Sequence, residues 1–149
     1  MHSCKLRGNF PEPTLFLGQS RLRVVGEVKF LGMVLNPKLS SIPHLRQLKD
    51  KCLKAMGLLR TLSHYSWGAD RISLLRIYRS LIRSKLDYGC QIYCSTPVSY
   101  LKIIHPIHHL GIRLSTSAIR TSTVRSLYAD SGEPPLTVRW EKLSLQLHI

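Results

Sequence analysis

The sequence predicts an α+β fold that is mostly helical, with a small N-terminal β unit followed by a helical bundle. Over residues 1–40, short runs rich in β-branched and aromatic residues alternate with turn residues, which is typical of a β-hairpin or a three-stranded meander. From residue 41 to residue 149, apolar residues recur at every third or fourth position, as on one face of an amphipathic helix. We therefore expect two domains, 1–40 and 41–149, the second resembling a thumb-like bundle of about four or five helices.

The N-terminal domain is expected to contain strands at residues 14–17, 21–25 and 28–35. Turn signals separate these runs, namely Gly18-Gln19-Ser20 and Gly26-Glu27. Asn36-Pro37 ends the last strand, because proline cannot donate a backbone hydrogen bond to a neighbouring strand.

The helical domain opens with apolar residues at three-and-four spacing, which predicts a helix between Pro43 and about His64; they are Leu45, Leu48, Cys52, Ala55, Met56 and Leu59. Asp70 is a suitable N-cap for a second helix. The apolar face of that second helix consists of Leu74, Leu75, Tyr78, Leu81, Ile82 and Leu86. Asp87 follows Arg83 by four residues, which predicts an ion pair between them.

Three further helices are expected toward the C-terminus. The third starts at Thr96-Pro97 and extends to about Leu114, but Pro106 should kink or break it because proline removes an intrahelical hydrogen bond. A shorter helix is expected around residues 124–129. Pro134-Pro135 introduces a final amphipathic helix, whose apolar residues are Leu136, Trp140, Leu143 and Leu147.

The charge balance is the strongest functional signal in the sequence. The chain carries 22 Lys and Arg against 8 Asp and Glu, which gives a formal net charge of +14 at pH 7 and a pI near 10.2. Such an excess repels itself unless a polyanion neutralises it, and nucleic acid is the commonest polyanion. An anionic membrane is the rival partner, but no apolar run approaches the roughly 20 residues that span a bilayer. We therefore expect nucleic acid, and no membrane, as the partner.

The sequence gives no sign of export. No apolar segment of a signal peptide follows Met1, and the four cysteines form no Cys-x-x-Cys pair. We expect reduced, mostly buried cysteines and an intracellular protein, which is nuclear where it is expressed.

Carboxylates that could support two-metal chemistry are dispersed. Polymerases and nucleases of that kind need clustered acidic ligands, and no two of the eight acids here are adjacent. Tyr128-Ala129-Asp130-Ser131 looks like the start of a Tyr-x-Asp-Asp turn, but Ser131 replaces the second Asp and the segment follows a helix-like run. We expect no catalytic residues, no metal ligands and no cofactor.

Three histidines form the next candidate site. His105, His108 and His109 could present two imidazoles on one helix face, which suits zinc. No cysteine or carboxylate lies close by in sequence to complete four ligands, and Pro106 disturbs the helix. A polar surface or a partner contact is the favoured interpretation.

The basic helical surface is the remaining candidate site. Its residues can direct cationic groups along a phosphate backbone; they are Lys49, Lys51, Lys54, Arg76, Arg79, Arg83 and Lys85. Any one of these charges is equally well explained as part of a solvated face. The shortage of compensating acids nevertheless favours contact with nucleic acid.

The chain closely resembles the C-terminal part of the reverse transcriptase of jockey-like non-LTR (LINE-type) retrotransposons. The resemblance covers nearly the whole sequence, and Leu86-Asp87-Tyr88-Gly89 on a basic helix is its most specific part. The matching segments are residues 28–36, 43–45, 48–49, 51–55, 67–71, 74–90, 120–122 and 134–136.

The resemblance implies the end of a polymerase palm followed by a thumb. It implies that Phe30, Leu31 and Gly32 lie in a primer-grip-like hairpin and support the primer terminus. It also implies that the helices track the minor groove of an RNA–DNA hybrid. The family's fingers, its Tyr-x-Asp-Asp turn and the partner Asp would lie upstream of Met1, so the missing palm and fingers are an expected protein partner.

We therefore predict a truncated reverse transcriptase fragment that cannot polymerise and binds template–primer duplex or hybrid without sequence preference. The alternative is a decayed, non-functional open reading frame that does not fold alone, because the sheet that would cover residues 14–35 is missing. The sequence departs from the family at His108-His109 and at residues 115–117, which agrees with decay of the copy.

Overall fold

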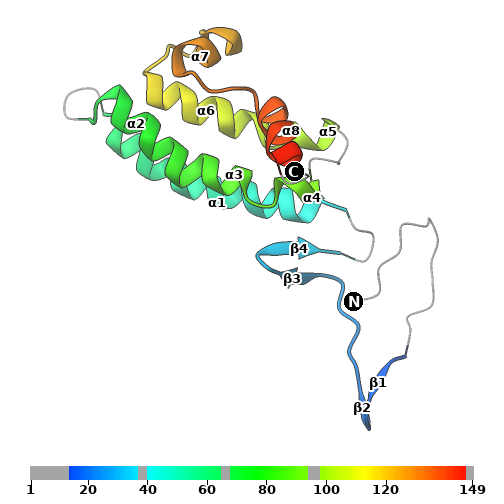
Figure 1. The fold of residues 1–149 in the computed structure, drawn as a ribbon. Helices are drawn as coiled ribbons and strands as arrows, with labels where there is room; N and C mark the ends of the chain where they lie inside the picture. The colour runs from blue at the N-terminus through cyan, green and yellow to red at the C-terminus, as the bar shows by residue number, and fades with distance from the viewer. Residues whose placement is uncertain (1–13, 37–39, 65–67, 94–97, 147–149) are drawn as a thin grey trace. The chain divides into compact units, whose positions relative to one another are not determined.

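The computed structural model describes residues 14–36, 40–64, 68–93 and 98–146. Short strands come first and helices make up the rest, which confirms the predicted α+β, mostly helical fold (Figure 1). The chain divides into two units, Met1–His44 and Leu45–Ile149. Within the described ranges, no helix is both long enough and apolar enough to cross a membrane.

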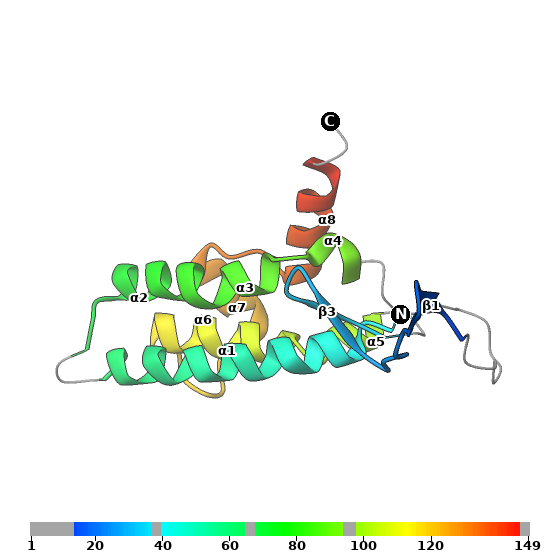
Figure 2. The ribbon, with the colours of Figure 1, turned by 90° about the horizontal axis from the view of Figure 1, so that it is seen from below.

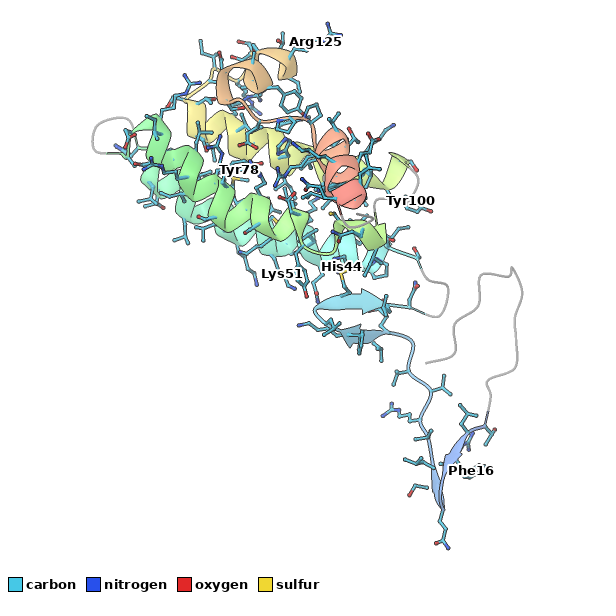
Figure 3. The ribbon with its side chains drawn as sticks, viewed as in Figure 1. Phe16, His44, Lys51, Tyr78, Tyr100 and Arg125 are labelled. Carbon is cyan, nitrogen blue, oxygen red and sulfur yellow. The ribbon has the colours of Figure 1, made fainter. Side chains whose placement is uncertain are left out.

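The first unit begins with a β-hairpin. Strand β1 (Phe16–Leu17) pairs antiparallel with β2 (Ser20–Arg21), and Phe16 lies opposite Arg21. The two-residue turn between them starts at Gly18, whose φ of 61° is a left-handed conformation that glycine adopts without strain. The side chains of Phe16 and Leu17 are exposed (Figure 3).

A second, separate hairpin follows, where the sequence predicted one strand over residues 28–35. Strand β3 (Val28–Phe30) pairs antiparallel with β4 (Met33–Leu35), and the two hairpins form two distinct sheets. The prediction of a continuous strand was wrong because Leu31 and Gly32 both have positive φ, 46° and 79°. Two consecutive left-handed residues reverse the chain direction in a tight hairpin turn. Of the two predicted arrangements, hairpins are therefore present, and the three-stranded meander is absent from the described residues.

The second hairpin is bonded to the start of the first helix, α1 (Ile42–Leu62). The Val34 backbone N–H donates to Nδ1 of His44 over 3.4 Å, and both residues are buried. The Asn36 side-chain oxygen accepts from the Ser40 N–H at 2.7 Å. These two bonds hold the end of β4 and the first turn of α1 together within the first unit.

Helix α1 contributes one wall of the core of the second unit. Its apolar stripe is buried as predicted, and its members are Leu45, Leu48, Cys52, Ala55, Met56 and Leu59. The helix ends at Leu62, close to the predicted end at His64. The Ala69 N–H donates back to the Leu62 carbonyl at 2.8 Å, so the connection to the next helix turns tightly.

The second helix is continuous over three segments, α2 (Arg71–Tyr78), the π-helical turn η1 (Arg79–Arg83) and α3 (Ser84–Asp87). Asp70 caps it as predicted, since its side chain accepts from the N–H groups of Ile72 and Ser73. Within η1 the pattern loosens, and the Ser84 N–H donates to the Arg79 carbonyl five residues back. This helix runs antiparallel to α1 (Figure 2).

The remaining helices are α4 (Cys90–Tyr93), α5 (Val98–Leu101), α6 (His105–Thr116), α7 (Val124–Ser131) and α8 (Leu136–Gln146). The predicted third helix is broken, because α5 ends at Leu101 and α6 begins just before Pro106. Proline is favoured at such a start, since the N–H it lacks would have no partner there. The predicted start of that helix, Thr96-Pro97, lies outside the described residues.

Helix α6 packs against α2 at its smallest residue. A Cβ built on Gly111 would lie 2.5 Å from Cε2 and 2.6 Å from Cδ2 of Tyr78, so only glycine fits against that ring. Met56 of α1 reaches the same point, 3.5 Å from that Cβ. One turn further on, the buried Ser115 hydroxyl donates to the Gly111 carbonyl at 2.8 Å. Three helices therefore meet at the Tyr78 ring.

Tyr78 and His108 form a polar pair inside this contact. The Tyr78 hydroxyl is hydrogen-bonded to Nδ1 of His108, and the two residues are 0% and 1% exposed. Burial lowers the pKa of His108 to about 3, and the neighbouring His109 lowers it further. Burial also raises the pKa of Tyr78. Both groups are therefore uncharged at pH 7, and the hydroxyl donates to the neutral imidazole.

Replacing Gly111 with alanine should lower the free energy of unfolding by about 1–3 kcal/mol, because the added methyl group overlaps the Tyr78 ring. Chemical denaturation followed by circular dichroism measures this change. Gly57→Ala in α1 is the matched control: nothing lies within 4 Å of a Cβ there, and alanine favours a helix interior by about 1 kcal/mol. Equal effects at the two positions would contradict the packing described here.

Stability should fall as the pH drops below the ordinary histidine pKa of 6.5 toward the folded value of about 3 for His108. In that window the unfolded chain binds a proton that the folded chain excludes, so the free energy of unfolding decreases by up to about 1.4 kcal/mol per pH unit. His105 and His109 act in the same direction, because burial also lowers their pKa values.

The variant His108→Gln should therefore flatten the dependence of melting temperature on pH without abolishing it. His64→Gln, at an exposed position, should leave the dependence as it is. A wild-type slope in His108→Gln would show that His108 is protonated in the folded chain.

Candidate nucleic-acid interface

The seven cationic residues predicted to contact nucleic acid come from two antiparallel helices. Lys49, Lys51 and Lys54 lie on α1, and the others lie on α2, η1 and α3, namely Arg76, Arg79, Arg83 and Lys85. Their surroundings differ sharply, so the structure separates them into groups.

The three lysines of α1 are exposed but do not form one stripe. At about 100° per residue, Lys51 and Lys54 lie on one flank of α1, and Lys49 lies roughly 160° around the helix from Lys51. Figure 3 shows Lys51 on the outside of the helix. None of the three forms an ion pair with a described residue. Only Lys51 and Lys54 can therefore contact one ligand surface together.

Lys85 of α3 joins this flank of α1. Burial raises the pKa of the Cys52 thiol to about 11, and the positive charges of Lys85 and Lys51 partly oppose the rise. Both ammonium groups therefore act on the same buried sulfur, from two different helices. We call Lys51, Lys54 and Lys85 the α1–α3 lysine group. The Cys52 thiol itself stays protonated at pH 7 and is not nucleophilic.

Arg79 and Arg83 are engaged by a buried acid. Nε of Arg79 donates to Oε1 of Glu133 at 2.6 Å, and Nη1 of Arg83 donates to both carboxylate oxygens at 2.7 and 2.5 Å. The Glu133 side chain is 1% exposed, whereas those of Arg83 and Arg79 are 20% and 44% exposed. Arg83 therefore serves mainly to neutralise Glu133, and Arg79 keeps part of its guanidinium at the surface.

Asp87 extends the same network. It lies 3.7 Å from Nε of Arg83, which confirms the ion pair predicted from their spacing. Arg139 of α8 donates to both oxygens of Asp87, with Nε at 3.0 and 2.8 Å. Hydrogen bonding to Asp87 raises the pKa of Arg139, so this guanidinium stays charged. The network thereby joins α8 to the end of α3.

Glu133, Arg71 and Arg139 are residues of this region that sequence reasoning missed. Arg79 and Glu133 are 54 residues apart, and Arg139 and Asp87 are 52 apart, so no local spacing indicates either contact. Arg71 donates from Nη2 to the Asp130 carbonyl at the end of α7. Arg76, in contrast, is exposed and forms no ion pair with a described residue.

The primer-grip-like residues lie at the turn of the second hairpin. Phe30 is 61% exposed and Leu31 is 73% exposed, and Gly32 completes the turn. They belong to the first unit, whereas the seven cationic residues belong to the second. The hairpin expected for this segment is therefore present, and its contact with a primer stays a prediction.

The histidines and the Tyr128–Asp130 segment have other partners. Nε2 of His109 is hydrogen-bonded to the Tyr128 hydroxyl at 2.8 Å, and Nδ1 of His108 is bonded to Tyr78. Tyr128 and Asp130 lie on helix α7 rather than between strands. Across the described ranges, no three His, Cys, Asp or Glu side chains come together in a way that could hold a metal ion.

The chain is 28% identical over 132 residues to the Retrovirus-related Pol polyprotein from type-1 retrotransposable element R1 of Bradysia coprophila. The match covers 87% of this chain and 13% of that polyprotein, so the chain spans a small part of the curated relative's length. No family model matches the chain, and no solved structure matches it. The chain is therefore related to a non-LTR retrotransposon protein, being similar over most of its length to a short part of a Pol polyprotein.

Proposed function

We propose that this chain is the end of the palm and the thumb of a non-LTR retrotransposon reverse transcriptase, and that it binds the phosphate backbone of a template–primer duplex without polymerising. The observation that carries this proposal is the set of exposed cations that no described acid neutralises. Among the described lysines and arginines, Arg79, Arg83 and Arg139 form ion pairs with described carboxylates, and the others do not.

The α1–α3 lysine group is the proposed centre of the interface. Lysine ammonium groups bind phosphates as point charges and release the counterions that surround nucleic acid. Such contacts fix the position of a protein on a duplex and carry no sequence information. Exposed Arg76 on α2 adds a donor that can hold one phosphate through two N–H groups.

The proposal includes no polymerase chemistry. Phosphoryl transfer by two metal ions needs acidic oxygens that converge on one point. In the described part of the chain, Glu133 and Asp87 are bound by arginines, and Asp70 caps α2. These carboxylates already have structural partners, which supports a role limited to binding.

A second candidate is a decayed open reading frame whose product does not fold alone. The exposed apolar residues of the two hairpins favour it for the first unit, since Phe16, Leu17 and Leu31 are each more than half exposed at 62%, 73% and 73%. The core of the helical unit argues against it for the rest of the chain. A cooperative unfolding transition, which the Gly111 comparison requires, would exclude it for the helical unit.

Binding to an RNA–DNA hybrid should weaken steeply with salt, with a slope of about 0.9 in log Kd against log salt for each phosphate contacted. The triple variant Lys51→Gln, Lys54→Gln and Lys85→Gln should lower that slope by about 2 to 3 and weaken binding equally for different sequences. Fluorescence anisotropy over a salt series measures both quantities.

The control removes three exposed charges elsewhere, by Lys102→Gln, Arg125→Gln and Lys142→Gln (Arg125 is labelled in Figure 3). Its slope should change by less than that of the first triple variant. Equal changes would mean that binding depends on net charge and not on the α1–α3 lysine group.

The purified chain should extend no primer above background when Mg²⁺, nucleotides and a primed RNA template are supplied, because it presents no cluster of acids to hold the metal ions. A gel-based extension assay measures this. Incorporation of nucleotides by the chain would contradict the proposal that it only binds.

A further inference from the structure

The end of α7 holds two arginines of the α2–η1 helix in place. Arg71 donates to the Asp130 carbonyl, and Nη2 of Arg79 donates to the Ser131 carbonyl over 3.5 Å. These carbonyls belong to the last residues of α7, where the negative end of the helix dipole attracts cations. Both arginines remain exposed, and the Arg79 side chain is 44% accessible.

Glu133 holds Arg79 at a second point. Its Oε1 accepts from Nε of Arg79 at 2.6 Å, from a side chain that is itself 1% exposed. Ser131 helps to fix this acid, since its hydroxyl accepts from the Glu133 backbone N–H at 3.2 Å. The guanidinium is therefore anchored from the inside through Nε, while Nη1 forms no hydrogen bond with a described residue. Its remaining N–H groups stay available to a ligand.

The geometry points to a phosphate-binding pair, Arg71 and Arg79, on the α7 side of α2, with Glu133 as the residue that positions Arg79. The inference rests on the proposed function, because its ligand is the phosphodiester backbone of nucleic acid. A free arginine loses side-chain freedom when it binds a phosphate, whereas one that is already held loses little. Arginine also matches a phosphate with two parallel N–H groups, which lysine cannot do.

This role has the opposite sign from simple electrostatics. Glu133 carries a negative charge, which by Coulomb attraction alone weakens binding of an anion. If Glu133 positions Arg79, its removal weakens binding even though the net charge becomes more positive. If Glu133 only neutralises arginines, its removal tightens binding.

The test uses the full chain and a fluorescently labelled RNA–DNA hybrid at fixed salt. Glu133→Gln should raise Kd by about threefold to tenfold, the loss expected when one long side chain must be ordered on binding. Glu141→Gln is the matched control, because it removes the same charge from an exposed position that forms no ion pair with a described residue. Its Kd should stay the same or fall. A Kd for Glu133→Gln at or below that of Glu141→Gln would overturn the inference.

A second pair of variants keeps the test valid if Glu133→Gln unfolds. Arg79→Lys preserves the charge but loses the Nε bond to Glu133, and it leaves the Arg83–Glu133 pair in place. It should raise Kd as Glu133→Gln does, whereas Arg125→Lys on α7 should not. In the Glu133→Gln background, Arg79→Lys should cause no further loss.

The outcomes separate this inference from the proposed function. A wild-type chain that binds no hybrid overturns the proposed function and this inference with it. A wild-type chain that binds, together with Arg79→Lys and Arg125→Lys variants of equal Kd, overturns the positioning role and leaves the proposed function standing.

Discussion

The helical unit depends on one buried carboxylate. Glu133 lies on the short connection between α7 and α8, and its ion pairs with Arg79 and Arg83 join that connection to the second helix. Moving a carboxylate out of water is unfavourable, so its pairs add little net stability while they are complete. Loss of one partner is different, because it leaves a buried charge without compensation and costs about 3–5 kcal/mol in fully buried pairs. The bundle therefore tolerates replacement of the whole network better than removal of Glu133 alone.

The same network decides how the positive charge of the chain is distributed. Glu133 and Asp87 are occupied by arginines inside the bundle, so they do not shield the lysines on its surface. Acids that paired with Lys51 or Lys85 instead would cancel the field that attracts a polyanion. A strongly basic protein thus keeps its internal ion pairs and its external charge in separate places.

Features set by neighbours in sequence could be predicted, and those set by distant contacts could not. The Asp70 cap and the Arg83–Asp87 pair follow from spacings of a few residues, and both are present. The second hairpin was read as a continuous strand because hydrophobic residues outweighed the one signal against it, Gly32. Glu133 had no local partner in sequence, so only the tertiary fold shows that it engages Arg79. The uneven placement of Lys49 and Lys51 around α1 could have been found earlier by projecting the helix.

The π-helical turn makes the second helix sensitive to phase rather than to length. A π turn holds more residues than an α turn, so η1 accommodates an extra residue within an otherwise α-helical run. Deleting one residue from it would restore regular α-helix and rotate all that follows by about 100°. Leu86 would then leave the core, and Asp87 would face away from Arg139. A single-residue deletion here would thus act at a distance, by uncoupling α8 from a helix whose own hydrogen bonds had become more regular.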